Sequence, residues 1–359
     1  MDEVRVPLAA LKGRGTANAF PHRFERAARE AFDDGWPAAE EDAAPAPRTE
    51  VIWETARSII TTNDSPDIYF GQSVNPYRGC EHGCIYCYAR PTHGYLNLSP
   101  GLDFETKIIA KRNAADLLRA ELGRRSYRPE LIALGSATDC YQPVERELRL
   151  TRGLIEVLHG TNHPFGLVTK SAGVERDLDL IAPMARQGLV TVFVTITTLD
   201  ADLARKLEPR AAAPHRRLRL LRTLAEHGVP CGVSLAPQIP FLNDDLEQVL
   251  EAAWDAGARE AFYQVLRLPW EVAPLFRQWL AMHFPQRAER VMHRIQDMRG
   301  GKDYDSDFAT RMKGAGTWAQ LLRQRFGRAA KRLGFNARRQ DLRTDLFRPP
   351  APPGQGSLF

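Results

Sequence analysis

Three cysteines in one short loop constrain this chain more than any other feature of its sequence. Cys80, Cys84 and Cys87 are separated by three residues and then by two, and they follow the run Asn-Pro-Tyr-Arg-Gly at 75–79. Iron–sulfur clusters are normally held by four cysteine thiolates. Three thiolates in one loop can therefore hold three irons of a cubane cluster and leave the fourth iron open. The spacing predicts a [4Fe–4S] site that a group other than cysteine completes.

Two other interpretations of these cysteines stay open on spacing alone. A zinc site would need a fourth ligand, which His82 or His93 could supply. Zinc sites usually pair cysteines as Cys-x2-Cys with a second pair further along, and this chain has no second pair. Disulfides fit poorly, because 5 cysteines in 359 residues are neither even in number nor dense. We favour the cluster over zinc and over disulfides.

The composition indicates a chain with a buried core and no visible membrane segment. Hydrophobic residues make up 43% of the sequence, enough for a proper core. The sequence shows neither an apolar run long enough to span a bilayer nor a basic-then-apolar leader. Because cluster ligands must stay reduced, we expect a cytoplasmic protein.

Charge is distributed unevenly along the chain. Residues 1–50 carry 7 Lys and Arg against 10 Asp and Glu, whereas residues 285–348 carry 16 against 7. The stretch 51–284 is close to neutral, with 26 against 27. A basic region beside a neutral core favours contact with nucleic acid phosphates. The alternative is a solvated, arginine-rich helical face.

Apolar runs of strand length alternate with helical periodicities through most of the chain. Each run is nearly continuous, as buried parallel strands are. Repeated right-handed βα units close toward a barrel, so we predict an α/β fold, a partial (β/α)6 TIM-like barrel that is open on one side. The six predicted strands are 70–76, 131–135, 165–169, 190–197, 229–236 and 260–266, and the clearest helical stretches are 144–159, 174–187, 214–227 and 243–256.

Composition further divides the chain into four segments. The Pro-, Ala- and acid-rich sequence near residue 42 predicts a largely disordered segment over 1–50. The partial barrel is predicted over 51–284, and a basic, mainly helical extension over 285–348. A proline-rich flexible tail is predicted over 349–359.

Residues 70–270 resemble the radical S-adenosylmethionine (SAM) enzymes, and among them a bacterial group of the spore photoproduct lyase-like branch. The resemblance rests on Cys-x3-Cys-x-aromatic-Cys, with Tyr86 as the aromatic residue, and on the runs 136–145 (SATDCYQPVE) and 167–171 (LVTKS). It implies a radical SAM barrel with a [4Fe–4S] cluster on the three cysteines and SAM on the open iron. It also implies a one-electron donor such as flavodoxin or ferredoxin. Reductive cleavage of SAM would then give a 5′-deoxyadenosyl radical that abstracts hydrogen from a substrate.

The resemblance also implies SAM contacts at the carboxyl ends of the predicted strands. Hydroxyl and carboxylate oxygens suit the methionyl ammonium of SAM, and a cation suits its carboxylate. Besides Tyr86, the matching positions are Ser136, Thr138 and Asp139 for the ammonium, Lys170 for the carboxylate, Thr195 near the ribose, and Arg210 for the carboxylate or a substrate phosphate.

The sequence departs from the lyase pattern at one position. In the lyase a hydrogen-donor cysteine precedes the Ser/Thr-x-Asp stretch, and here Gly135 or Ser136 stands in that place. Cys140, just beyond Asp139, is a candidate hydrogen donor from a shifted position, although we favour a buried hydrophobic role for it. The departure argues against the splitting of DNA dimers. Cys231, within a predicted strand, is expected in the core.

The last residues, Gln355–Phe359, read Gln-Gly-Ser-Leu-Phe and resemble the peptide by which bacterial replication and repair proteins bind the sliding clamp. A leucine and a phenylalanine on a flexible tether can fill an apolar pocket at modest ordering cost. The sequence thus predicts a clamp-binding tail.

Three functions remain open on the sequence. The favoured one is a radical SAM enzyme that acts on nucleic acid, as in DNA repair. The second is a radical SAM enzyme with a protein or small-molecule substrate. The third is a non-catalytic iron–sulfur or zinc module for binding or sensing.

Overall fold

A seven-stranded sheet forms the centre of the molecule, seen in a computed structural model that describes residues 10–25, 47–338 and 341–350. The strand order is β10-β9-β8-β7-β6-β3-β2, and all neighbours are parallel except β2 with β3. The strands are β2 (Ile60–Thr62), β3 (Gln72–Val74), β6 (Ile132–Leu134), β7 (Phe165–Thr169), β8 (Val190–Thr195), β9 (Cys231–Gln238) and β10 (Glu260–Val265).

The predicted α/β fold is confirmed. Five of the six predicted strands contain one of the six mutually parallel strands, and the remaining one, 229–236, overlaps β9, which ends at Gln238. Their buried side chains form one core cluster, in which Val74, Leu134, Leu167, Val194 and Val233 come from five successive strands. The sheet does not close on itself, because β10 lies at one edge and β2 at the other. The barrel is therefore partial and open on one side.

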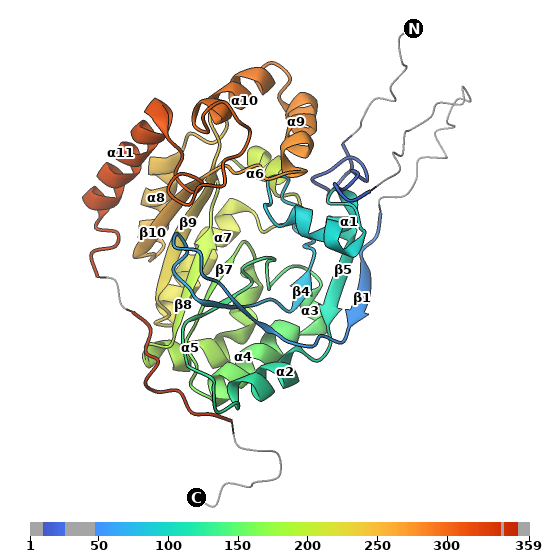
Figure 1. Ribbon diagram of the computed structural model, residues 1–359. Helices are drawn as coiled ribbons and strands as arrows, with labels where there is room; N and C mark the ends of the chain where they lie inside the picture. The colour runs from blue at the N-terminus through green and yellow to red at the C-terminus, as the bar shows by residue number, and fades with distance from the viewer. Residues whose placement is uncertain (1–9, 26–46, 339–340, 351–359) are drawn as a thin grey trace, which may run out of the picture.

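Amphipathic helices cover this sheet. The apolar face of each helix is buried, as Leu154, Ile155 and Leu158 of α4 illustrate. Figure 1 shows α2, α4 and α5 side by side, with α11 alongside α8. The helices within the barrel are α2 (Ala114–Leu122), α3 (Glu145–Leu148), α4 (Leu150–Gly160), α5 (Leu178–Arg186), α6 (Ala201–Leu207), α7 (Pro214–Glu226) and α8 (Leu246–Asp255), with a 3₁₀ turn, η3 (Ala172–Asp177), before α5.

The prediction of one helix over 144–159 is wrong in one respect. Arg149 adopts a left-handed backbone conformation with φ of 52°, which ends α3 and starts α4 in a new direction. The carboxylate of Glu145 accepts hydrogen bonds from the backbone N–H groups of Thr151 and Arg152, at 3.0 and 3.4 Å. These N–H groups lie in the first turn of α4 and have no partner within the helix, so Glu145 stabilises the break.

A second, three-stranded sheet lies beside the barrel and was not predicted. It has the order β1-β5-β4 and contains β1 (Glu50–Glu54), β4 (Tyr77–Arg78) and β5 (Lys107–Lys111). The chain reaches β5 through a 3₁₀ segment, η2 (Arg90–Leu96), and the short helix α1 (Leu102–Thr106). The cysteine loop lies between β4 and η2, so the second sheet supports its outer side.

Residues 10–25 lie against the body of the molecule, within the segment predicted to be largely disordered. The backbone N–H groups of Gly15 and Thr16 donate to the carboxylate of Glu105, at 2.9 and 3.1 Å. Arg23 forms an ion pair with Glu271 at 2.9 Å. The segment thus connects the end of α1 with the loop that follows the last strand of the barrel.

The basic extension after the barrel is helical, and much of its charge is compensated within the chain. Arg311 pairs with Asp67, Arg325 with Glu247, and Arg332 with Glu251. These pairs reduce the charge that is available to phosphates on this face. The helices from the end of the barrel onward are α9 (Val272–His283), α10 (Ala288–Asp297) and α11 (Gly316–Leu333). Within the described ranges, no helix is long and apolar enough to cross a bilayer.

Candidate cluster and cofactor site

The three cysteines lie on a succession of tight turns at the carboxyl end of β3. The N–H of Gly83 donates to the carbonyl of Cys80, and the N–H of Cys87 donates to that of Cys84, both at 3.2 Å. Gly83 has a φ of +66°, and a Cβ there would meet the carboxylate of Glu105 at 2.7 Å. A glycine is therefore required between the first two cysteines, both for the turn and for the close approach of Glu105.

The thiols are an all-sulfur donor set in a buried setting. Burial and the nearby charges of Asp139, Cys84 and Cys87 raise the pKa of Cys80 well above its ordinary value. Burial also raises the pKa of Cys84 to about 12, against the opposing charge of Lys170. Thiolates that are costly to form in isolation become favourable when iron takes the place of the proton. The donor set suits an iron–sulfur cluster.

The histidines that could complete a zinc site have other partners. His82 Nδ1 lies 3.3 Å from the carboxylate of Asp139, and His93 Nε2 lies 3.1 Å from the carbonyl oxygen of Lys107. In the described part of the chain, no three His, Cys, Asp or Glu side chains are gathered so as to hold one metal ion. In a cubane each thiolate binds a different iron, so its ligands do not have to meet at one point.

A buried carboxylate, Glu208, ties the cysteine loop to the strand ends. It accepts hydrogen bonds from the hydroxyls of Tyr86 and Thr197 and pairs with the guanidinium of Arg217. Burial alone would raise the pKa of Glu208, but the charges of Arg217 and Lys170 and the two hydroxyl bonds hold it below its ordinary value. Tyr86, the aromatic residue of the motif, is thereby fixed between the cysteines and β8.

Replacement of Glu208 by glutamine tests this arrangement. The amide can still accept a hydrogen bond, but the charge opposite Arg217 is lost. We expect the free energy of unfolding to fall by about 1.5–3 kcal/mol, the usual worth of a hydrogen bond to a charged group. Urea denaturation measures it, with Glu156→Gln as a control because Glu156 is exposed on α4. Equal losses in both variants would contradict a specific role for Glu208.

A second buried ion pair holds the loop from the other side. Arg90 and Glu105 are both fully buried and lie 2.6 Å apart. Arg90 also donates to the carbonyls of Gly83 and Cys84, both at 2.9 Å. The backbone that carries the first two cysteines is therefore hydrogen-bonded directly to a fixed guanidinium.

The polar residues after β6 lie at the carboxyl end of the sheet, as the sequence predicted. Ser136 Oγ accepts a hydrogen bond from Asn75 at 3.1 Å. Thr138 Oγ1 is buried and has no hydrogen-bond partner among the described residues, which fits a position that binds a polar group such as an ammonium. The carboxylate of Asp139 accepts from the Thr169 hydroxyl at 2.8 Å and from the Lys170 backbone N–H at 2.7 Å. Asp139 therefore also joins the ends of β6 and β7.

The remaining predicted contacts lie in two different places. The ammonium of Lys170 lies 5.8 Å from the centre of the Tyr86 ring, and the charges of Cys84 and Glu208 raise the pKa of Lys170 although burial would lower it. Thr195 is buried at the end of β8. Arg210 is held elsewhere, by an ion pair with Glu81 at 3.0 Å and a hydrogen bond to Thr49 at 3.2 Å. Lys170 and Thr195 thus stay candidates for contact with SAM, whereas Arg210 lines a neighbouring pocket.

Cys140 and Cys231 are both buried. Burial raises the pKa of the Cys140 thiol well above its ordinary value, and the carbonyl of Cys140 accepts a hydrogen bond from the Thr151 hydroxyl at 2.6 Å. Cys231 lies in β9 with its sulfur 3.7 Å from the carbonyl oxygen of Leu221. The role of Cys140 as a hydrogen donor stays a prediction.

His93 makes the stability of the site region depend on pH. Its ring is fully buried, and its Nδ1 has no hydrogen-bond partner in the part of the chain that the structure describes. Burial lowers the pKa of His93 from its ordinary 6.5 to about 4. Between these values the unfolded chain binds a proton that the folded chain does not. The free energy of unfolding therefore falls as the pH drops from 6.5 to 4, and His93 causes no further loss below pH 4.

We expect His93 to contribute up to about 3 kcal/mol to the fall in unfolding free energy across this interval. Urea denaturation at pH 7, 5.5 and 4 measures the slope. His93→Phe should give a shallower slope, but not a flat one, because burial also lowers the pKa of His163 to about 4. A slope that does not change in the variant would contradict the assignment.

Comparison with known proteins decides which family this site belongs to. The family model described as the radical SAM superfamily matches residues 74–253, from the end of β3 through most of α8. The chain belongs to the radical SAM superfamily. The match contains all three loop cysteines and every residue of the predicted cofactor site.

Relatives of this radical SAM protein occur in bacteria and archaea. The uncharacterized protein Rv2578c of Mycobacterium tuberculosis (strain H37Rv) is 40% identical over 244 residues, which cover 67% of this chain and 71% of the relative. The uncharacterized protein MJ0683 of Methanocaldococcus jannaschii is 26% identical over 247 residues, which cover 69% of this chain and 88% of the relative.

Solved structures with the same fold include forms of spore photoproduct lyase. A mutant of that lyase with bound AdoMet and dinucleoside spore photoproduct matches with a TM-score of 0.53 and 15% identity, over 79% of this chain and 80% of the other. At this identity the similarity shows the fold alone. The chain is a radical SAM enzyme, and the cofactors of this family are a [4Fe–4S] cluster and SAM. Cys80, Cys84 and Cys87 would hold the cluster, and polar side chains at the strand ends would hold SAM. When bound, these cofactors supply a 5′-deoxyadenosyl radical for hydrogen abstraction.

Sequence reasoning missed the residues that hold the loop in place. Glu208 and Arg217 were not singled out, although Glu208 stands directly before the Pro-Arg pair that drew attention to Arg210. Arg90 and Glu105 were missed as well. The available signal was a charged residue among apolar neighbours in the sequence. Such a residue is fully buried only when it has a partner of opposite charge.

Proposed function

We propose that this radical SAM enzyme abstracts hydrogen from nucleic acid in a reaction of the DNA repair type. The observation that carries the proposal is a set of exposed aromatic side chains in contact with arginines, near the last loop cysteine and after β10. Arg267, just after β10, lies 4.7 Å from the ring centre of Tyr88, which directly follows the last cysteine. Tyr88 is 48% exposed and Trp270 is 62% exposed.

A further arginine, Arg23 of the amino-terminal segment, contacts three aromatic rings. The guanidinium of Arg23 lies 4.4 Å from the ring centre of Trp270, 4.8 Å from that of Phe24 and 5.4 Å from that of Tyr95. Aromatic rings beside arginines suit unpaired bases, since every base can stack on a ring and every phosphate attracts a guanidinium. Similarity to a fold that binds a dinucleoside spore photoproduct in another protein supports the same substrate class.

Hydrogen transfer from labelled nucleic acid tests the proposal. The protein is reconstituted with iron and sulfide under argon, reduced with dithionite and given SAM with a DNA oligonucleotide deuterated in its sugars and bases. We expect deuterium in the 5′-deoxyadenosine, and none with Cys84→Ala. Deoxyadenosine that forms without deuterium from single-stranded or duplex DNA would oppose the proposal.

The second candidate is a protein or small-molecule substrate. The observation that favours it is the burial of Cys140, the candidate hydrogen donor at a shifted position, whose thiol is not exposed. This candidate would be favoured if deoxyadenosine forms only when a cell extract depleted of nucleic acid is added.

The sliding-clamp contact stays a prediction, because Gln355–Phe359 lie outside the described residues. Removal of Leu358 and Phe359 should abolish co-purification of the enzyme with the clamp while leaving SAM cleavage unchanged. The absence of any interaction with the intact chain would contradict the prediction.

A further inference from the structure

A pocket of about 530 Å³ lies next to the cysteine loop and is separate from the cofactor site. His82 of the loop forms one wall, and the other walls come from the segments that follow β6, follow β7 and precede α7. Neither the three cluster cysteines nor Thr138 or Lys170 lines it. It lies at the carboxyl ends of the strands, where barrels of this type bind their ligands.

The pocket is rich in arginine. Its lining includes Arg146, Arg176, Arg210 and Arg216, against the carboxylates of Glu145 and Glu175. The lining groups therefore carry an excess of two positive charges, from four arginines less two glutamates. Guanidinium groups that converge on a concave site are the usual partners of phosphate and carboxylate groups.

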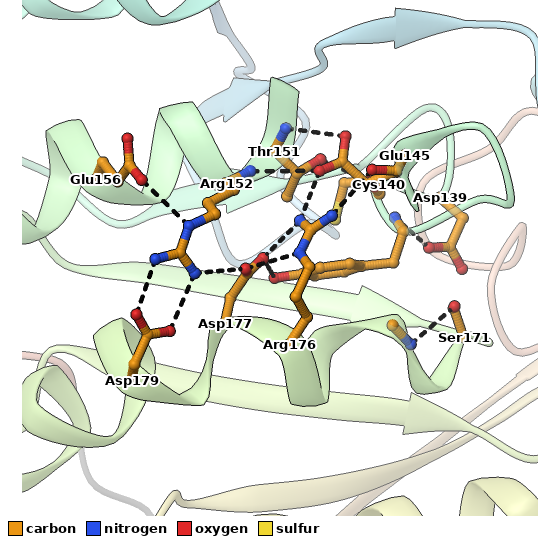
Figure 2. A network of polar contacts seen from close by, with 12 residues as sticks. Asp139, Cys140, Glu145, Thr151, Arg152, Glu156, Ser171, Arg176, Asp177 and Asp179 are labelled. Carbon is orange, nitrogen blue, oxygen red and sulfur yellow. Dashed lines mark hydrogen bonds and ion pairs between the residues drawn. The ribbon is translucent and has the colours of Figure 1, made fainter. Parts of the chain in front are cut away.

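An ion-pair network fixes one wall of the pocket. Figure 2 shows Arg176 between Glu145 and Asp177, with Arg152 bound to the other side of Asp177. Arg176 donates to Glu145 Oε1 at 2.7 Å and to Asp177 Oδ1 at 2.9 Å. Asp177 is buried and also accepts from the Tyr141 hydroxyl at 2.8 Å. Arg176 is therefore held in a fixed position, with most of its donors used.

The other three arginines keep donors to spare. Arg216 uses two of its nitrogens on Glu175, and Arg210 uses two on Thr49 and Glu81. A guanidinium has five N–H groups, so each retains N–H groups beyond those bonds. Arg146 is exposed, and its side chain forms no hydrogen bond or ion pair with the described residues.

We infer that this pocket binds a phosphate group. The inference does not depend on the proposed function, because the phosphate can belong to a free small molecule or to a nucleic acid backbone. Three observations favour phosphate over a protein partner. The site is concave, its free donors are planar guanidinium forks on separate elements, and one of them has no partner in the described chain. A docking protein would instead require a broad surface of about 800 Å².

Binding to the reconstituted full-length protein tests the inference in two arms. Inorganic phosphate is titrated by calorimetry, and a fluorescein-labelled single-stranded DNA 12-mer is followed by anisotropy. The variants are Arg146→Gln, whose side chain has no partner to lose, and Arg216→Gln. Arg222→Gln is the matched control, because Arg222 is exposed further along α7 and does not line the pocket.

We expect each pocket variant to weaken binding about tenfold or more, as loss of a charge-assisted hydrogen bond does, while the control binds like the wild type. A loss with inorganic phosphate alone assigns the pocket to a small phosphate compound, and a loss with DNA assigns it to the backbone. Equal binding by all proteins in both arms, or no binding by the wild type, overturns the inference. The inference is also overturned if Arg146→Gln and Arg216→Gln bind both probes normally but accept electrons from an acidic flavodoxin more slowly than the wild type does.

Discussion

Replacement of Cys84 by alanine is expected to abolish SAM cleavage by this enzyme. Cys84 is the middle ligand of the loop and is buried between Lys170, Glu208 and the other cysteines. Its loss leaves only two thiolates in the loop, whereas iron–sulfur clusters are normally held by four cysteine thiolates. We expect no 5′-deoxyadenosine above background after anaerobic reconstitution, together with weaker visible absorption from the cluster.

Cys231→Ala is the control, since Cys231 is equally a buried cysteine but lies within β9, away from the loop. It should keep both the absorption and the activity. Cleavage by Cys84→Ala at the wild-type rate would contradict the assignment of the cluster ligands. Equal loss in both variants would point to general damage to the fold.

Replacement of Arg90 by methionine is expected to be the most destabilising single change near the site. Methionine fills similar space but leaves the carboxylate of Glu105 buried without its cation. The carbonyls of Gly83, Cys84, Pro100 and Gly101 also lose a donor. Breaking a buried ion pair typically costs about 3–5 kcal/mol.

Urea denaturation measures the loss, and iron content after reconstitution measures its effect on the loop. Arg57→Met is a suitable control, because Arg57 is exposed and lies outside this network. Removal of both charges offers a further test, with the double variant Arg90→Met and Glu105→Leu. It should recover part of the stability lost in Arg90→Met. No recovery would show that the carbonyl contacts of Arg90, or the hydrogen bonds from Gly15 and Thr16 to Glu105, outweigh the cost of the unpaired charge.

The strands β6, β7, β8 and β9 could be predicted because each is a short, mostly apolar run that is buried along nearly its whole length. The run at 165–169 coincides with β7 (Phe165–Thr169) for this reason. The second sheet could not be predicted in the same way. β4 is only 2 residues long, and β1 is partly exposed, so neither has a pattern of its own. Both depend on β5, which pairs with them from a distant part of the sequence.

The cluster ligands could be predicted because their spacing is local, whereas the groups that hold them are not. Glu208 lies 122 positions from Tyr86, and their contact depends on how β8 and α6 place one residue against the loop. A single sequence contains no signal for such a pairing. The contact of Arg210 stays a prediction. The resemblance implied that it binds the SAM carboxylate or a substrate phosphate, and Glu81 and Thr49 hold its side chain at the neighbouring pocket.

The contacts of residues 10–25 mean that a part of the chain outside the barrel joins its two sides. Thr16 is bound on the side of the cysteine loop through Glu105, and Arg23 is bound beyond the last strand through Glu271. The second contact is partly exposed, so salt screens it more strongly than the first. Removal of the chain up to residue 25 would thus remove this connection between Glu105 and Glu271 without removing any strand. A shortened enzyme would keep its cluster ligands and differ in how it admits substrate.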